Sequence, residues 1–377
     1  MTAASAAGYG KQTAGDESEH LPGLSMHFIY ESAPARVVFF AGALSQLPAE
    51  VERLGRRALI LSTPGHRQLA DDVARSLGAR SAGVFAGAMM HVPIQTAQAG
   101  RLAARDLKAD CLVAIGGGST TGLAKAIALE LELPILAVPT TYAGSELTAI
   151  WGLTENSRKR TGVDPRVRPK TVLYDPELTA GLPFALSLTS AINAVAHCVE
   201  ALYAQQANPA LAAIAEEGIR LIAASLPILA LKGVDPTARE RLLCGAWLGG
   251  IALDGGGGAL HHKLCHTLGG SFNLPHAETH TVVLPHALAY NAPAVPEAIA
   301  RIGRALESNA PAGALYDLIA KLGGPTSLRE LGMRAEDLEP AVELALQNPY
   351  YNPRPITRDG VRALLQAAFE GRRPTAT

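Results

Sequence analysis

Short apolar runs alternate with stretches of helical periodicity along the first half of the chain. Four runs have the length and composition of buried strands: 57–62, 82–85, 111–115 and 134–138. The segments between them repeat their apolar residues with the spacing of a helix: 67–77, 93–107 and 120–132. Short strands that alternate with longer helices are typical of βαβ units. The pattern therefore predicts a parallel sheet covered by helices.

The pattern changes near residue 180. After Leu178 the sequence is rich in alanine and leucine with a period near 3.6 residues, which predicts helices. We expect proline and glycine to break these helices at Pro209, Pro227, Pro236, 255–258, Pro275 and Pro285. The four glycines at 255–258 form too short a run for a linker, so they predict a close approach of the backbone to a ligand or a neighbouring helix.

These changes divide the chain into three parts. Residues 1–24 are small, polar and without pattern, so we expect a mobile extension and no signal peptide. Residues 25–178 form the predicted α/β domain, and residues 179–377 form the predicted all-α domain. A run of about 18 apolar residues, which a membrane span needs, is not found in the sequence. We therefore expect no membrane association.

The composition narrows the class of protein. Of the 377 residues, 48% are hydrophobic and 18% are charged, which is typical of a globular protein. The net charge is −1 and the basic runs are short, so neither nucleic acid nor an anionic membrane is an expected partner. The four cysteines lack CxxC spacing and lie among apolar or small residues. We interpret them as reduced thiols of a cytoplasmic enzyme.

A glycine loop follows the apolar run at 111–115 and precedes a predicted helix. It reads Gly116-Gly117-Gly118-Ser119-Thr120. Glycines at this place let a phosphate approach the backbone N–H groups, and the helix N-terminus adds partial positive charge. A glycine turn without a ligand is the alternative. The order of strand, glycines and helix favours a pyrophosphate cradle, although the loop is not a GxGxxG fingerprint.

A second polar loop follows the next predicted strand. It contains Thr140, Thr141 and Ser145. Hydroxyl groups at the carboxyl end of a parallel strand face the crevice where such sheets bind ligands. The alternative is a turn in which these hydroxyls cap the next helix.

Six of the eleven histidines lie between His261 and His286. Imidazole titrates near neutral pH and is the commonest metal ligand in proteins. The group therefore indicates proton transfer, metal binding or anion recognition. Single histidines that cap helices or lie satisfied in the core are the alternative for any one of them.

Several ordered motifs together resemble the iron-type alcohol dehydrogenase superfamily, whose fold is similar to that of dehydroquinate synthase. The motifs are GGGSTTGLAKAIAL, PTTYAGSELTAIWGLTENSRKRTGVDPRV, YDPELT, INAVAHCVEALYA, HHKLCHTLGGSFNLPHAETHTVVLPHA and NPRPIT. Within the superfamily the chain is most similar to the maleylacetate reductases. The resemblance extends from about Phe28 to Gly371.

The resemblance implies an N-terminal nucleotide-binding α/β domain, an all-α catalytic domain and an active site in the cleft between them. It also implies a homodimer that uses NADH or NADPH. Residues Gly117, Gly118 and Ser119 would bind the pyrophosphate, and Thr140, Thr141 and Ser145 would line the nicotinamide. Lys159 matches a lysine that reaches the cofactor ribose, although a solvated charge in a basic turn is an equal alternative.

The chain departs from the metal-dependent members of the superfamily. The positions that match their aspartate and three histidine ligands are Asn193, His197, His266 and His276, so the anionic ligand is replaced by an amide. The aspartate of their glycine loop is likewise replaced, by Gly122. Three imidazoles can bind zinc, but iron(II) centres usually include a carboxylate. Both departures are similar to the pattern of the maleylacetate reductases, a group that works without metal, so the resemblance implies that no metal is bound.

The resemblance also implies the substrate, maleylacetate, a small dicarboxylate that is reduced to 3-oxoadipate. Hydride addition beside a conjugated ketone builds negative charge on the ketone oxygen, which imidazoles can stabilise before one delivers a proton. The candidate catalytic residues are His197, His266, His276, His262 and Lys263. Of these, His262 and Lys263, together with Arg354, are candidates to bind the substrate carboxylates. A salt bridge in its turn is the alternative for Arg354, and His286 is interpreted as structural.

The residues after the second predicted strand bear on the cofactor. Members selective for NADH usually have an aspartate there, whereas this chain has Ser62-Thr63-Pro64, so we expect both NADH and NADPH to be used. Three other functions remain open: a metal-dependent alcohol or polyol dehydrogenase of the same fold, a lyase-type relative, and a catalytically silent nucleotide-binding scaffold. Bound iron or zinc would distinguish the first. The absence of a lysine and arginine cluster disfavours the second, and the converging histidines disfavour the third.

Overall fold

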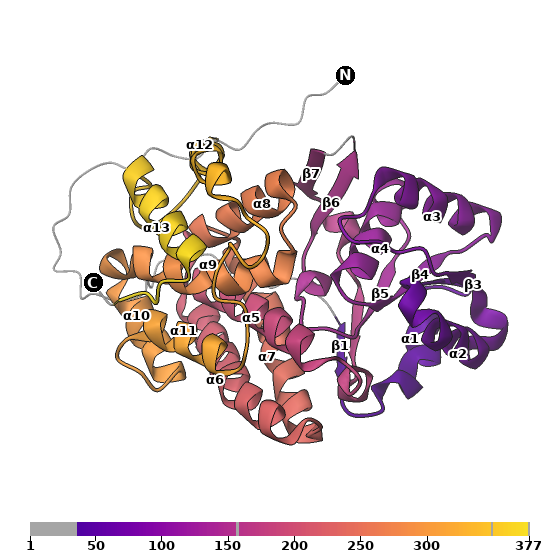
Figure 1. The fold of residues 1–377 in the computed structure, drawn as a ribbon. Coiled ribbons are helices and arrows are strands. Elements are labelled where there is room, and N and C mark those ends of the chain that lie inside the picture. The colour runs from indigo at the N-terminus through magenta and orange to yellow at the C-terminus, as the bar shows by residue number, and fades with distance from the viewer. Residues whose placement is uncertain (1–35, 156–157, 348–349, 376–377) are drawn as a thin grey trace, which may run out of the picture.

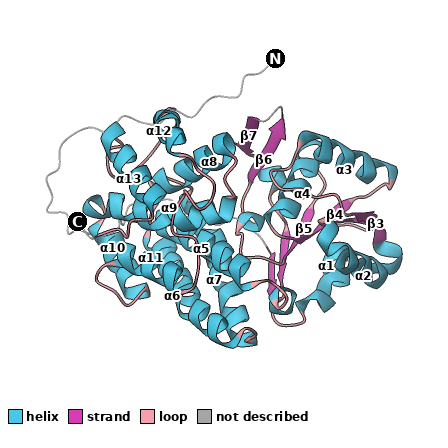
Figure 2. Cartoon of the chain, viewed as in Figure 1, coloured by secondary structure: helices cyan, strands magenta, loops and turns pink. Residues whose placement is uncertain are grey.

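The computed structural model of the protein describes residues 36–155, 158–347 and 350–375. The predicted extension at 1–24 lies outside these residues. An α/β domain, drawn in indigo and magenta, is followed by a helical domain, drawn in orange and yellow (Figure 1). Figure 2 places the described strands in the first of these domains. The predicted fold class, an α/β domain followed by an all-α domain, is confirmed.

Six parallel strands form one sheet in the order β1-β8-β5-β4-β2-β3. Their bounds are Arg36–Phe39 (β1), Ala58–Leu61 (β2), Ser81–Phe85 (β3), Cys111–Gly116 (β4), Ile135–Pro139 (β5) and Thr171–Tyr174 (β8). The central strands are apolar on both faces because helices cover both sides of the sheet. Along β2, for example, Ile60 belongs to one helical layer and Leu61 to the other.

Four helices form these two layers: α1 (Leu47–Leu54), α2 (Arg67–Leu77), α3 (Ile94–Asp106) and α4 (Gly118–Leu131). Helices α1 and α2 pack on one face of the sheet, and α3 and α4 pack on the other. The chain leaves β2 toward β3 at one edge, whereas it leaves β4 toward β5 in the opposite direction. Sheets of this kind bind ligands at such a switch point, outside the carboxyl ends of the strands. The glycine loop follows β4 at this point.

Nine described helices form the second domain: α5 (Phe184–Ala201), α6 (Pro209–Lys232), α7 (Pro236–Gly256), α8 (Leu260–Phe272), α9 (His276–Asn291), α10 (Pro296–Ala305), α11 (Pro311–Lys321), α12 (Leu338–Leu346) and α13 (Arg358–Glu370). Helix α5 contacts α6, α7 and α9. It is the one described helix that is long and apolar enough to cross a membrane, but 78% of it is buried inside the protein. We therefore interpret α5 as a core helix.

Two predicted helix breaks are wrong. Pro227 lies inside α6 and Pro285 lies inside α9. A proline within a helix removes one backbone hydrogen bond and can bend the helix without ending it when the surrounding packing supports both halves. The glycine run at 255–258 allows close packing of helices, because a Cβ added at Gly256 would lie 2.8 Å from Ala201 Cα of α5.

A two-stranded antiparallel hairpin was not predicted. It consists of β6 (Ile150–Glu155) and β7 (Arg158–Val163) and lies outside the main sheet. The sequence of β7 is RKRTGV, which is too polar to read as a buried strand. Edge strand β1 and the inner strand β8 were also missed.

Candidate active site

The glycine loop has the form of an anion cradle. Strand β4 ends at Gly116, and α4 begins at Gly118. No side chain caps the N-terminus of α4, so the N–H groups of its first turn can bind a ligand. A Cβ added at Gly118 would have no protein atom nearer than Ala143 Cβ, at 3.9 Å. The exposed backbone of Gly118 therefore borders open space in which a phosphate can lie.

The polar loop after β5 faces this cradle. A Cβ added at Gly117 would lie 2.8 Å from Thr141 Oγ1, so the two loops approach closely. Thr140 Oγ1, Ser145 Oγ and Ser62 Oγ are buried and have no hydrogen-bond partner among the described residues. Buried hydroxyls without partners are rare in folded proteins. Their position at the carboxyl ends of β2 and β5 fits the ribose and nicotinamide of a dinucleotide.

Lys125 of α4, which the sequence reasoning missed, fixes the shape of the polar loop. Its buried ammonium donates hydrogen bonds to the carbonyl oxygens of Ser145 (2.6 Å) and Ile150 (2.8 Å), and to Thr148 Oγ1 (3.0 Å). Burial lowers the pKa of Lys125 to about 7, although the carboxylate of Glu146 opposes that shift. A lysine within the apolar helix sequence LAKAIAL was the available signal.

The histidines gather where α5, α8 and α9 meet. His197 lies on α5, His262 and His266 lie on α8, and His276 and His280 lie on α9. Their neighbouring ring centroids are 4.4 to 6.3 Å apart. The ring of His262 stacks on that of His197 at a centroid distance of 5.1 Å.

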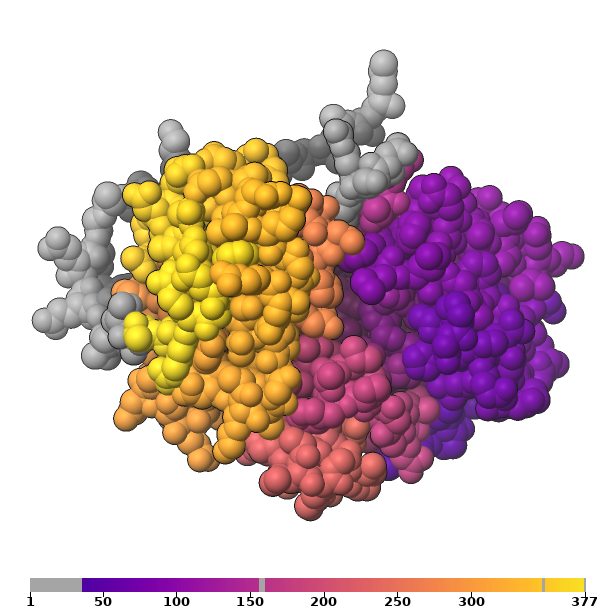
Figure 3. All heavy atoms as spheres, viewed as in Figure 1, coloured from indigo at the N-terminus to yellow at the C-terminus, as the bar shows by residue number. Residues whose placement is uncertain are grey.

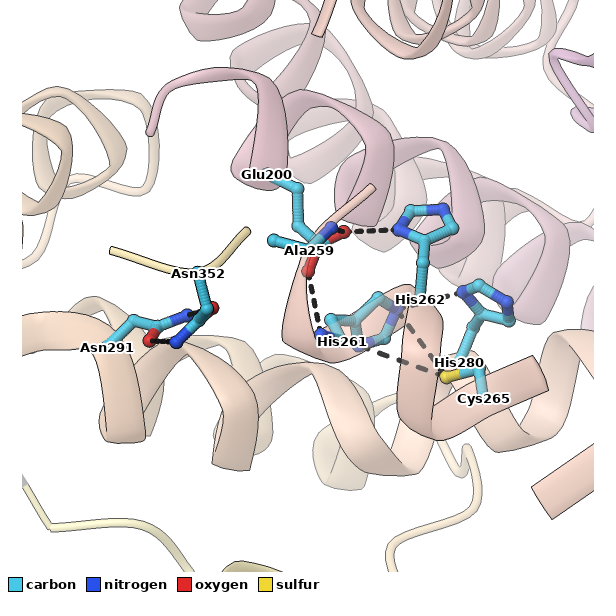
Figure 4. A network of polar contacts seen from close by, with 8 residues as sticks. All are labelled: Glu200, Ala259, His261, His262, Cys265, His280, Asn291 and Asn352. Atoms are coloured by element: carbon cyan, nitrogen blue, oxygen red, sulfur yellow. Dashed lines mark hydrogen bonds and ion pairs between the residues drawn. The ribbon is translucent and has the colours of Figure 1, made fainter. Parts of the chain in front are cut away.

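A buried carboxylate connects these helices. Glu200 Oε2 lies 2.5 Å from His262 Nδ1, and the same carboxylate accepts hydrogen bonds from the backbone of α8 (Figure 4). Sequence reasoning missed Glu200. It lies three residues after His197 on α5, which places both on one helix face.

Burial controls the charge of several of these imidazoles. It lowers the pKa of His197, His261 and His280 well below the usual value, and the neighbouring histidines lower it further. These three rings are therefore neutral near pH 7. His261 Nε2 lies 2.8 Å from His280 Nδ1, so one of these nitrogens donates to the other.

The polar loop after β5 lies next to the histidines. A Cβ added at Gly144 would lie 3.1 Å from His197 Nδ1, and Asn193 Nδ2 is 3.5 Å from the carbonyl oxygen of Ala143. A cavity of about 430 Å³ is lined by His266 and His276 from the helical domain and by residues such as Thr154 from the α/β domain. Figure 3 shows the surface indented along the boundary between the two domains. A cavity of about 460 Å³ along residues 299–309 contains no histidine.

The candidate cations differ in their surroundings. Lys263 Nζ lies 5.4 Å from the centre of the Tyr350 ring. Arg354 donates to the carbonyl oxygen of Tyr290 at 2.6 Å and stacks on the same tyrosine, so its guanidinium has a structural role and does not support binding of a substrate carboxylate. The backbone of Lys159 pairs with Thr154 in the hairpin, but the Lys159 side chain lies outside the described part of the chain.

Comparison with known proteins identifies the family of the chain. Residues 34–176 match the model of the iron-containing alcohol dehydrogenases, and residues 187–369 match the C-terminal model of the same family. The chain belongs to the iron-containing alcohol dehydrogenase family. It is 56% identical to the maleylacetate reductase of Burkholderia cepacia over 92% of this chain and 99% of that protein.

Solved structures of two maleylacetate reductases are similar to this structure. The maleylacetate reductase of Agrobacterium tumefaciens has a TM-score of 0.90 at 50% identity, and that of Rhizobium sp. strain MTP-10005 has a TM-score of 0.89 at 49% identity. Each match covers 93% of this chain and 100% of the other. The predicted resemblance to maleylacetate reductases within the family is confirmed.

The described residues do not fit an iron centre of this family. Asn193 Oδ1, His197 Nδ1 and His262 Nε2 are buried without hydrogen-bond partners among the described residues. They supply only neutral donors, however, and iron(II) sites usually include a carboxylate. The carboxylate beside them, Glu200, already uses both oxygens to bind His262 and the backbone of α8.

A second group of donors could bind a metal ion. The ligand atoms of His261, Cys265 and His280 lie within 4.8 Å of one another, and all three residues are buried. Two of the three already bind each other, because His261 Nε2 and His280 Nδ1 form a hydrogen bond. Cys265 remains a free thiol whose pKa is raised well above the usual value by burial.

His286 lies inside α9 rather than in a turn, and its structural role can be tested by pH. Burial lowers the pKa of His286 to about 4, whereas an unfolded histidine has a pKa near 6.5. Between these values the unfolded chain binds the extra proton, so stability falls as the pH falls. From pH 6.5 to 5 we expect a loss of about 2 kcal/mol from this group.

Urea unfolding of the wild type and of His286→Gln at pH 7.5 and 5 measures this loss. The variant should be less stable at pH 7.5 but should lose less stability on acidification than the wild type does. Equal losses in the two proteins would show that His286 is not the group concerned.

Proposed function

We propose that the protein reduces the C=C bond of maleylacetate to 3-oxoadipate with NADH or NADPH. The observation that carries this proposal is the near full-length likeness to maleylacetate reductases, 50 to 56% identical. The histidine cluster beside the glycine cradle supports it, as does the amide at position 193. Purified protein should consume NADH when maleylacetate is added and should form 3-oxoadipate. Oxidation of simple alcohols without turnover of maleylacetate would refute the proposal.

Different residues would bind the cofactor, stabilise the developing charge and bind the substrate. When bound at Gly117 and Gly118, NAD(P)H supplies the hydride. The histidines between the domains stabilise the negative charge that develops on the ketone oxygen, and one of them gives a proton to the carbon next to the ketone. Lys263, which follows His262 on α8, is the proposed partner of a substrate carboxylate.

The proposal that the protein uses both NADH and NADPH rests on the residues at the end of β2. Ser62 and Thr63 occupy the place where a carboxylate would repel a 2′-phosphate. Residues 62–67 include no aspartate or glutamate, and Thr63 Oγ1 lies 3.0 Å from His66 Nδ1. Initial rates with each cofactor at equal concentration test the proposal, and a strict preference for NADH would contradict it.

We propose that the protein works without a metal, because the side chains at the site offer few suitable ligands. Because Asn193 supplies no negative charge and the oxygens of Glu200 are already bonded, iron(II) should bind weakly. We expect turnover to be unchanged after dialysis against EDTA, and elemental analysis to find less than stoichiometric divalent metal. Loss of activity on chelation, restored by one divalent ion that is bound stoichiometrically, would overturn this proposal.

We further propose a homodimer in the cytoplasm. Val163 of the hairpin is 74% exposed and its strand partner Ile150 is 40% exposed, which supports a partner surface there. The four free cysteines support a reducing compartment. Light scattering in reducing buffer should give twice the mass of 39.3 kDa, and a monomer at all concentrations would contradict the dimer.

A further inference from the structure

Lys125 is a buried cation in an otherwise apolar stretch of α4. It is 1% exposed, and its neighbours from 123 to 128 are buried leucine, isoleucine and alanine residues. An ammonium that leaves water costs free energy unless hydrogen bonds replace its hydration. An apolar side chain would fill the same position without this cost. The lysine therefore indicates a role for the ammonium itself.

Residues 145–150 surround the ammonium of Lys125. It donates to the carbonyl oxygens of Ser145 and Ile150 at 2.6 and 2.8 Å, and to Thr148 Oγ1 at 3.0 Å. An ammonium has three N–H donors, so these three acceptors satisfy it fully. Thr148 Oγ1 in turn donates to the carbonyl oxygen of Ser145 at 3.2 Å. The stretch 145–150 thus folds around one charge, as it would around a bound cation.

The stretch that Lys125 holds borders the cofactor cradle. Ser145 Oγ is buried without a hydrogen-bond partner among the described residues, and it lies 4.0 Å from a Cβ added at Gly118. Gly144, the residue before it, has a φ of +80° and lies next to His197. A shift of Ser145 would therefore change the space between the cradle and the histidines.

Helix α4 connects the cradle to this stretch. Gly118 begins α4, and Lys125 follows seven positions later, which is about two turns further along the same face. The N–H groups of the first turn can bind the pyrophosphate, while Lys125 holds the carbonyl oxygen of Ser145. Because both contacts are made by one helix, α4 sets the distance between the pyrophosphate and the polar loop.

We propose that Lys125 is a positioning residue for the nicotinamide half of NAD(P)H. Through the carbonyl oxygen of Ser145, it holds the polar loop at the distance from the cradle that the nicotinamide requires. This inference rests on the proposed function, because it places the nicotinamide beside Ser145. The adenosine and pyrophosphate half, which binds at the start of α4, does not depend on Lys125.

The variant Lys125→Met tests this role. Methionine keeps an unbranched apolar side chain but removes the charge and the three donors. We expect Kd for NADH to rise by about 10-fold, because buried carbonyl oxygens lose their partner and the loop rearranges. Kd for ADP-ribose, which lacks the nicotinamide, should change little. Isothermal titration calorimetry measures both ligands. Equal losses for the two ligands, or an unchanged Kd for NADH, would overturn the proposal.

Arg101→Met is the matched control. Arg101 of α3 is also a buried cation, 6% exposed, and it donates to a backbone carbonyl oxygen of α4, that of Ala126, at 2.8 Å. Its contact holds α3 on α4 and does not involve the polar loop. This variant should unfold at a lower temperature and keep the wild-type Kd for both ligands. A selective loss of NADH affinity here as well would refute a specific role of Lys125.

Turnover should respond to the same change. A displacement of about 1 Å from the geometry of hydride transfer can cost about 100-fold in rate. Lys125→Met should therefore lower kcat for maleylacetate by about 10- to 100-fold at saturating NADH, with little change in KM for maleylacetate. A rise in KM for maleylacetate with kcat intact would contradict a positioning role.

Thr148→Val provides a second variant should Lys125→Met fail to fold. It removes one acceptor of the ammonium and keeps both carbonyl contacts, so the selective loss of NADH affinity should be smaller. An unchanged Kd for NADH in Thr148→Val would overturn the proposal. Where both variants fold, the double variant should lose no more affinity than Lys125→Met alone, because the two residues act as a unit. Multiplied losses would refute this shared role.

The inference and the proposed function fail in different ways. The comparison of NADH with ADP-ribose needs no substrate, so it reads the role of Lys125 directly. Failure of the wild type to reduce maleylacetate refutes the proposed function instead.

Discussion

A Gly118→Val variant should fold normally and lose its binding of NADH and NADPH. The nearest protein atoms to an added Cβ at Gly118 are Ala143 Cβ at 3.9 Å and Ser145 Oγ at 4.0 Å, so a branched side chain fits the empty protein. It would occupy the space in front of the first turn of α4, where the pyrophosphate must lie to meet the backbone N–H groups. Fluorescence titration with each cofactor measures the effect, and thermal unfolding checks the fold.

Gly181→Val is the matched control for this variant. Gly181 has no neighbouring atom within 4 Å of an added Cβ and lies outside the cleft loops, so the substitution should alter neither stability nor cofactor affinity. Unchanged affinity for NADH in Gly118→Val would refute the cradle, and with it the placement of the cofactor at the switch point between β2 and β4.

The helices and strands that were predicted best are those whose pattern of apolar residues matches the faces that they bury in the fold. Helix α2 matches the predicted 67–77 at both ends, because its apolar spacing marks one buried face. Strand β4 was predicted from CLVAI because both of its faces are buried, which leaves a continuous apolar run. The hairpin partner β7 was missed because RKRTGV is stabilised by pairing with β6 rather than by an apolar face.

The parts of the candidate site that could be predicted are those whose residue type alone indicates a chemical role. Clusters of histidines and glycines can be recognised in the sequence. The structure brings together His197, His262, His266 and His276. Glu200 and Lys125 could not be found in the same way, because their roles depend on which backbone groups lie opposite them. Glu200 binds residues about 60 positions away, and only the packing of α5 on α8 creates that contact.

His266→Ala and His276→Ala should each lower kcat for maleylacetate by about 10²-fold or more while cofactor affinity changes little, as loss of an oxyanion-stabilising or acid–base group does. His266 is exposed on α8, His276 begins α9, and both line the cavity between the domains. His197→Ala should have a comparable effect on kcat, because the ring of His197 stacks on that of His262 and lies next to Gly144 of the polar loop.

His286 provides the contrast within the same helix as His276. It is buried away from the cavity, so its replacement should reduce stability and leave turnover of the folded fraction nearly intact. Stopped-flow measurement of NADH oxidation, normalised to folded enzyme, separates the two effects. Near-full turnover in both His266→Ala and His276→Ala would show that the substrate does not meet these imidazoles. The site of hydride transfer would then have to be sought elsewhere along the interdomain cleft, beside the loop that contains Thr141.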